Sequence, residues 1–179
     1  LGTFNLPFNS LSAFNTVNNG TGNNPAAGDR IFIYQRGTTY AGGITLLNNQ
    51  QLIGQGEDLS ALVGALPLGS PILPGATSNP SITNNSGPVI SLNNGNDIRG
   101  LNTTGPAGDA ITGNNTIGGS FQNITISGAT SSGIFLNGTP SGTFTFASNV
   151  TIDATTTGVA FFVNGGNANI TFSGSITKT

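Results

Sequence analysis

Residues 144–152 read FTFASNVTI and residues 170–178 read ITFSGSITK, so one pattern of apolar and hydroxyl residues returns after 26 positions. Apolar and polar residues alternate in both copies, which is typical of a β-strand with one buried face. Apolar positions keep the same interval elsewhere: Ile98, Ile124, Val150 and Ile176; Phe144 and Ile170; Phe146 and Phe172; Ala110, Leu136 and Phe162. A fixed period of about 20 to 50 residues indicates a solenoid.

The residues between these positions indicate which solenoid forms. No stretch of the repeat has helical periodicity, and each unit offers short strands separated by turns such as Asn137-Gly138. Such a unit corresponds to one coil of a single-stranded parallel β-helix, whose coils stack about 4.8 Å apart and align residues one period apart. The sequence therefore predicts an all-β parallel solenoid of roughly six or seven coils.

The composition excludes several functions. Charged residues make up 6% of the 179 residues, and the four basic ones cannot form the basic surface that binds nucleic acid. No apolar run is long enough for this segment to insert into a membrane. The chain has no Cys and no His, which excludes thiolate nucleophiles, Ser–His triads and imidazole metal ligands. We expect no cofactor.

The N-terminal residues depart from the repeat and are expected to cap its first coil. Ser10 can serve as the N-cap of a short helix over residues 10–17, with Leu11 and Phe14 as its apolar stripe. Strands are expected at 30–34, 43–47 and 51–53, and the apolar, Pro-containing segment 59–75 is expected to form a long loop. We therefore divide the chain into a cap (1–27) and one β-helix domain (28–179), and we expect it to belong to a longer protein.

The opening coil resembles a known family. Its motifs are GDRIFI at 28–33, GTTY at 37–40, GITL at 43–46 and LIGQG at 52–56. Over residues 8–56 this order is similar to that of right-handed parallel β-helix proteins of the pectate-lyase-like superfamily, which includes the passenger domains of bacterial surface adhesins and autotransporters. Ala27 stands where that pattern has Pro. The resemblance implies a right-handed coil behind a short capping helix, and an extracellular or cell-surface location.

Enzymes on this fold use carboxylates gathered on one face, with Ca²⁺ or a basic residue. The six carboxylates of this chain are scattered along it: Asp29, Glu57, Asp58, Asp97, Asp109 and Asp153. We expect Asp29 to bind turn amides and Asp97 to form a weak, exposed ion pair with Arg99. Glu57 and Asp58 are adjacent and form either a solvated turn or part of a Ca²⁺ site. We assign no catalytic residue and expect no enzyme activity.

Two groups of aromatic residues are candidates for a ligand or assembly surface. Phe135 and Phe161 are 26 residues apart. If Leu136 and Phe162 point inward, then Phe135 and Phe161 point outward and stack, forming a sugar platform or a lateral assembly surface. The opposite phase, or further chain lying over them, would bury them. Tyr34 and Tyr40, on either side of Arg36, are a second candidate for glycan contact.

Outward-facing threonines form a third candidate. Thr125, Thr151 and Thr177 keep the 26-residue interval and predict a flat, uncharged Thr ladder. Flat Thr arrays can order water, so ice binding is one hypothesis. The alternative is that Thr simply favours strands and needs no ligand there. Arg99, one period before Thr125, is expected to interrupt the ladder.

Taken together, the sequence favours a non-catalytic structural and adhesive module of a secreted or cell-surface protein, with end-to-end stacking as one form of self-assembly. The expected partners are the remainder of a longer chain, other copies of the chain, and glycans. The alternative is a polysaccharide-binding or polysaccharide-degrading β-helix domain, whose groove would gather Tyr34, Arg36, Glu57 and Asp58.

Overall fold

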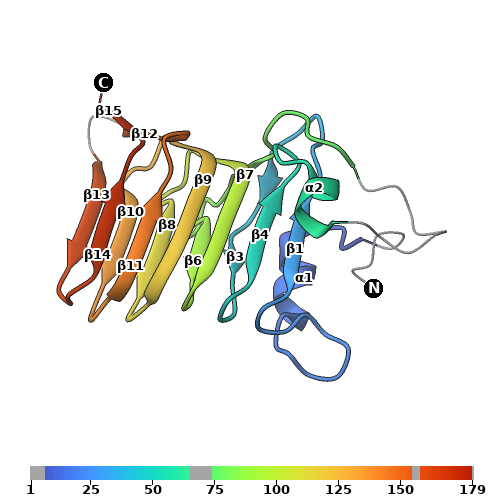
Figure 1. The fold of residues 1–179 in the computed structure, drawn as a ribbon. Coiled ribbons are helices and arrows are strands. Elements are labelled where there is room, and N and C mark those ends of the chain that lie inside the picture. Colours follow the sequence, from blue (N-terminus) through green and yellow to red (C-terminus); the bar gives the residue numbers. More distant parts are fainter. Residues whose placement is uncertain (1–6, 65–73, 155–157, 179) are drawn as a thin grey trace.

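The computed structural model describes residues 7–64, 74–154 and 158–178. Strands from six successive coils follow one another along one sheet, and each pair of neighbouring strands in the described residues is parallel. Figure 1 shows the coils stacked from the N-terminal to the C-terminal end of the molecule. The predicted all-β parallel solenoid is therefore confirmed.

Each complete coil has three sides, called here faces A, B and C. Face A consists of β1 (Arg30–Ile33), β4 (Gln51–Gly54), the first halves of β7 (Asn96–Thr104) and β9 (Ile117–Ser127), β11 (Ser141–Phe146) and β14 (Asn169–Phe172). Face B consists of β2 (Tyr40–Ala41), β5 (Ser81–Thr83), the second halves of β7 and β9, β12 (Val150–Ala154) and β15 (Ser175–Lys178). Face C consists of β3 (Ile44–Thr45), β6 (Ile90–Leu92), β8 (Ile111–Asn114), β10 (Ser132–Asn137) and β13 (Val159–Asn164).

Faces A and B form one continuous sheet because β7 and β9 run through both of them. Positive φ angles of 66° at Gly100 and 50° at Asn123 lie between the two halves of these strands. The left-handed region suits Gly and, among other residues, Asn, so the long strands can change direction there without leaving the ladder.

Apolar side chains of successive coils lie beside one another and fill the interior. On face A the inward column is Ile31, Leu52, Ile98, Phe121, Phe146 and Phe172. On face C it is Ile44, Ile90, Ile111, Ile134 and Phe161. The rings of Phe121 and Phe146 stack in parallel with their centres 4.4 Å apart. Burying each such side chain contributes about 1.5–3 kcal/mol, so these columns are a main source of stability.

The constant 26-residue interval is only partly correct. Val150 lies beside Ile124 as predicted. However, Ile98 lies beside Phe121, and Ile176 lies beside Ile152. The interval between paired residues on adjacent strands ranges from 21 on β1 and β4 to 46 on β4 and β7, and it is 27 on β10 and β13. The corner turns differ in length between coils, and parallel pairing constrains the strands rather than the turns.

The predicted N-terminal capping helix is confirmed. Helix α1 (Leu11–Val17) has Ser10 as its N-cap, which accepts a hydrogen bond from the Ala13 amide, and both Leu11 and Phe14 are buried. The Asn15 side chain donates to the Gly43 carbonyl and accepts from the Thr45 amide. These bonds occupy backbone groups beside and within β3, which is the edge strand of face C. The cap therefore covers the apolar end of the stack and one of its open edges.

The expected loop at 59–75 is wrong in its first part, because helix α2 (Leu59–Val63) forms there with Asp58 as its N-cap. The side chain of Asp58 accepts from the Ser60 and Ala61 amides and so stabilises the first turn. Residues 65–73 of this segment lie outside the described residues. Neither helix in the described parts of the chain has the length and apolar character that crossing a bilayer requires.

Candidate binding surfaces

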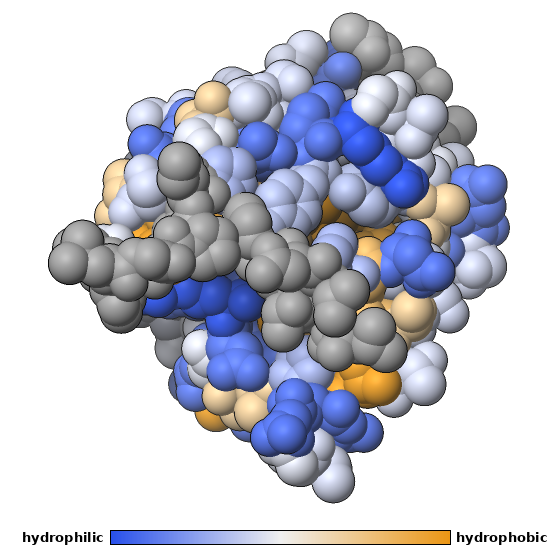
Figure 2. All heavy atoms as spheres, turned by 90° about the vertical axis from the view of Figure 1, so that its right-hand side faces the viewer, coloured by the Kyte–Doolittle hydropathy of each residue, from blue (hydrophilic) through white to orange (hydrophobic). Residues whose placement is uncertain are grey.

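The N-terminal end contains a cavity of about 490 Å³ between α1 and the first coil. Figure 2 looks onto this end and shows apolar side chains gathered there, with hydrophilic ones around them. Phe8 and Phe14 line the cavity from the cap side, with ring centres 5.7 Å apart. Ile31 and Ile44 line it from the first coil. The volume is in the range of small-molecule sites, and the lining is chiefly apolar.

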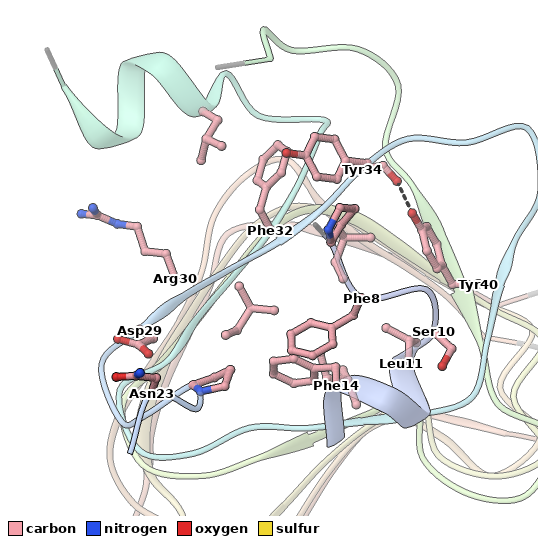
Figure 3. Close-up of a pocket in the computed structure, with 16 residues that line it drawn as sticks. Phe8, Ser10, Leu11, Phe14, Asn23, Asp29, Arg30, Phe32, Tyr34 and Tyr40 are labelled. Carbon is pink, nitrogen blue, oxygen red and sulfur yellow. Dashed lines mark hydrogen bonds between the residues drawn. The ribbon is translucent and has the colours of Figure 1, made fainter. Parts of the chain in front are cut away.

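Tyr34, Tyr40 and Arg36 are brought together at the edge of this cavity, and both tyrosines line it. The Tyr40 hydroxyl donates to the Tyr34 carbonyl at 2.8 Å, as Figure 3 shows. The Arg36 guanidinium lies 3.7 Å from the centre of the Tyr40 ring and donates to the carbonyls of Thr38 and Thr39. Burial raises the pKa of both tyrosines, and the charge of Arg36 partly opposes this at Tyr40. These contacts hold the turn in one shape.

The predicted outward stack of Phe135 on Phe161 is wrong. Phe135 instead stacks on Phe162, with ring centres 5.3 Å apart and planes within 4° of parallel. Phe161 lies beside Ile134 and meets Phe146 edge to face inside the stack. Face C coils are 27 residues apart at this point, one more than the repeat, and in a strand a shift of one residue exchanges the inner and outer sides. Phe162 is 45% exposed and Phe135 is half-buried.

The Thr ladder is correct for two of its three members. Thr125 and Thr151 are paired across β9 and β12. Thr151 is followed by Ser175, whereas Thr177 lies beside Asp153. The expected interruption by Arg99 is also wrong, because the residue beside Thr125 on the preceding coil is Asn102.

Three of the carboxylates, Asp29, Glu57 and Asp58, hold the local fold. Glu57 accepts a hydrogen bond from the Asn123 side chain at 2.9 Å, and Asp29 accepts one from the Ala26 amide at 2.8 Å. The Ser60 hydroxyl lowers the pKa of Asp58, with desolvation acting in the opposite direction. Glu57 and Asp58 therefore act on separate partners. Within the described residues, no three Asp or Glu side chains come close enough together to hold a metal ion.

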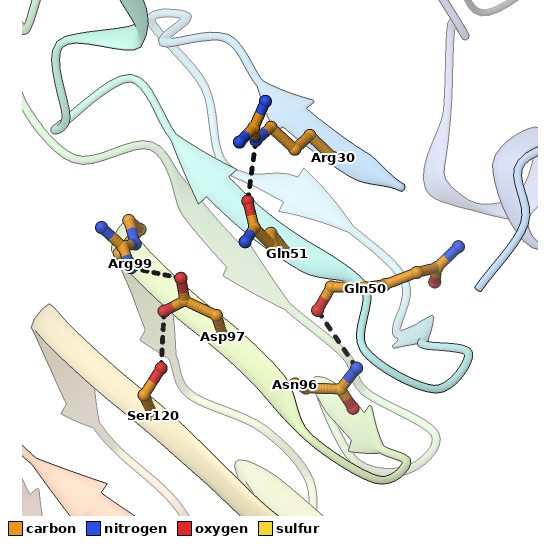
Figure 4. A network of polar contacts seen from close by, with 7 residues as sticks. All are labelled: Arg30, Gln50, Gln51, Asn96, Asp97, Arg99 and Ser120. Carbon is orange, nitrogen blue, oxygen red and sulfur yellow. Dashed lines mark hydrogen bonds and ion pairs between the residues drawn. The ribbon is translucent and has the colours of Figure 1, made fainter. Parts of the chain in front are cut away.

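Polar side chains on face A link neighbouring coils in two separate groups, as Figure 4 shows. Arg30 donates to the Gln51 side chain at 2.8 Å, the predicted pair of Asp97 and Arg99 is present, and Ser120 donates to Asp97 at 2.8 Å. Arg30, Gln51, Asp97 and Arg99 also line a pocket of about 170 Å³. These bonds align neighbouring coils in pairs. The ion pair is partly buried and not exposed as expected, because the side chains of Asp97 and Arg99 are only 14% and 21% exposed.

Two buried amides were not singled out from the sequence. Gln50 is 0% exposed and Asn96 is 1% exposed. Gln50 donates to Asn18 and Ala26 and accepts from the Leu47 amide, which ties the cap to the corner between faces C and A. The Asn96 side chain donates to the carbonyls of Leu47 and Gln50 on the preceding coil. A pattern in the sequence could have identified both residues: an Asn or Gln stands at the start of a largely apolar strand, at the same corner of successive coils.

Comparison with known proteins finds no family that matches the chain, and no curated protein or solved structure that is significantly similar to it. The assignment of the fold therefore rests on the strand pairing and the buried columns described above.

Proposed function

We propose that the chain is a non-catalytic structural and adhesive module of a secreted or cell-surface protein. The observation that carries the proposal is the unbroken stack, in which face A strands pair in order from β1 to β14 over a continuous apolar column. Such a stack resists bending and can hold surface groups in fixed positions. The likeness of the opening coil to passenger domains of bacterial adhesins supports the same role.

The use of the acidic side chains also supports a non-catalytic role. Asp29 and Asp58 bind backbone amides, Glu57 binds Asn123, and Asp97 binds Arg99 and Ser120. A polysaccharide lyase or hydrolase needs carboxylates that face the substrate. In this chain these four carboxylates instead face partners that maintain the fold.

Incubation with a panel of soluble and insoluble polysaccharides tests the module directly. Two quantities are measured: depletion of the protein from solution, and release of reducing ends or unsaturated uronates. We expect depletion by at least one insoluble polymer without release of product. Turnover of any polymer, with or without added Ca²⁺, would overturn the non-catalytic assignment, and absence of depletion by every polymer would remove the adhesion to glycans.

Polysaccharide binding is the second candidate, and the Phe135–Phe162 stack favours it. Phe162 is 45% exposed, and aromatic rings in this setting supply apolar area for the faces of sugar rings. Phe162→Ala is expected to reduce retention on a glycan array, whereas Thr145→Ala, an outward substitution on face A, is expected to leave it unchanged. Equal retention by both variants would exclude the stack as a glycan site.

The proposed module also self-associates by end-to-end stacking. Helix α1 lies against the first coil, and its Leu11 and Phe14 belong to the core cluster. A second copy could stack on that end only by displacing the helix, so we propose that copies meet at the opposite end. Sedimentation velocity over a concentration series tests this, and a single monomeric species at all concentrations would rule it out.

A further inference from the structure

Face B carries an array of short polar side chains arranged in two columns. On five successive strands, two outward-facing residues are separated by one residue. These ten residues, called here the hydroxyl array, are Ser81 and Thr83, Asn102 and Thr104, Thr125 and Ser127, Thr151 and Asp153, and Ser175 and Thr177. Eight of the ten carry a hydroxyl group, and Asp153 is the single charged member.

The strand register places these residues side by side. Asn102, Thr125, Thr151 and Ser175 follow one another in the first column. Thr104, Ser127, Asp153 and Thr177 do so in the second.

Burial places the array on the outer side of the sheet, where Thr125, Asp153, Ser175 and Thr177 are exposed and the other six members are partly exposed. The residues between the two columns on the first four strands are Ile82, Thr103, Ile126 and Ile152, and each of them is at most 1% exposed. Adjacent strands are about 4.8 Å apart and alternate residues on a strand about 6.7 Å apart, so the array is a two-dimensional lattice.

Internal hydrogen bonds fix some of the hydroxyl groups in place. Ser175 donates to the Thr151 hydroxyl at 3.2 Å, which links two coils within the first column. Ser127 donates to the Thr103 carbonyl at 3.3 Å. Because the underlying strands are already paired, the positions of the side chains are set on folding and little conformational entropy remains to be lost on binding.

The other two faces lack such a lattice. On face A the column that continues through Ser120, Thr145 and Thr171 begins with Arg30, Gln51 and Asp97. On face C the column of Thr45, Ser91 and Thr112 ends in Phe135 and Phe162. The preference of Thr for strands acts equally on all three faces, so it does not explain why only face B carries short polar side chains in both columns over five strands.

We propose that the hydroxyl array binds the surface of ice. Its two repeats are close to those of the oxygen atoms on the prism faces of ice, and the Thr hydroxyl and methyl groups together can hold water in positions that continue the crystal. The array contains no aromatic ring for the face of a sugar, so a crystalline polysaccharide is the less suitable partner. This activity goes beyond the module proposed above and uses a different face from Phe135 and Phe162.

Inhibition of ice recrystallisation and partition into a growing ice front test the proposal on the full chain. Thr125→Lys places a long charged side chain in the middle of the array. Thr145→Lys is the matched control. Thr145 is also an exposed, outward Thr on a strand with a paired strand on each side, but it lies on face A. Circular dichroism of both variants verifies that each one folds.

The wild-type chain is expected to stop recrystallisation and to enter the ice, Thr125→Lys to lose both activities, and Thr145→Lys to keep both. Lack of either activity in the folded wild-type chain would overturn the proposal. Equal loss in both variants would overturn the assignment to face B. Binding to crystalline cellulose that depends on Thr125, without partition into ice, would identify a polysaccharide instead and likewise overturn it.

Discussion

Replacing Phe146 with Ala tests the packing of the aromatic column inside the stack. Phe146 is 0% exposed, and its ring centre lies 4.4 Å from that of Phe121 and 5.3 Å from that of Phe161. Removing a buried Phe ring costs about 3–5 kcal/mol through lost burial and the cavity left behind. The ring centre of Phe172 is 5.5 Å away as well. Aromatic pairs contribute about 0.5–1.5 kcal/mol each, so a site with three close ring neighbours belongs at the upper end of that range.

Phe162→Ala is the matched control, since Phe162 also stacks on a ring of the preceding coil but is 45% exposed. We expect it to cost only about 1 kcal/mol, because much of the ring already contacts water. Urea unfolding followed by far-UV circular dichroism gives both values from the shift in midpoint at constant slope. Phe146→Leu, a smaller reduction in volume, provides a second measurement if the Ala variant does not fold.

Equal losses in the two variants, or a larger loss for Phe162→Ala, would refute the reasoning. Either result would mean that the inner and outer sides of the coils are exchanged relative to the structure. A change in the slope of the urea transition without a change in its midpoint would contradict a purely local loss of packing, since the slope reports the surface exposed on unfolding.

Three further predictions concern the cap, a turn and a helix end. Gln50→Ala is expected to lower the free energy of unfolding by about 2–4 kcal/mol because it orphans several buried partners, whereas the partly exposed Gln51→Ala should cost less than about 1 kcal/mol; thermal unfolding compares them. Tyr40→Phe removes the bond to the Tyr34 carbonyl and should cost about 0.5–1.5 kcal/mol in the same measurement, and no change would show that this bond adds nothing. The pKa of Asp58 is lowered by folding, so its stabilisation of α2 is present above the ordinary value of 3.8 and is lost as the pH falls through the lower, folded value. The protection factor of the Ser60 amide, the exchange rate of the unstructured chain divided by that of the folded chain at the same pH, should therefore fall in acid, and Asp58→Asn should remove that pH dependence.

Much of the candidate site chemistry could be anticipated locally, because residues a few positions apart in a strand or a turn meet whatever the rest of the fold does. The pairing of Asp97 with Arg99 and the grouping of Tyr34, Arg36 and Tyr40 are of this kind. Contacts between different coils could be predicted less well from the sequence. The bond from Asn123 to Glu57 joins residues 66 positions apart, across an insertion whose path no local pattern indicates.

The sequence by itself determined the parallel β-solenoid, the alternation of buried and exposed residues, and the capping helix at Ser10, because periodic burial and helix capping act over a few residues. Only the tertiary structure decided which residues lie beside one another. Thr177 beside Asp153 and Phe162 beside Phe135 both depart from the 26-residue interval. The hydrogen bonds of a parallel ladder do not depend on which side chains lie opposite each other. The register therefore follows from the length and shape of each corner turn and from the packing of the core, and both are properties of the folded coil as a whole.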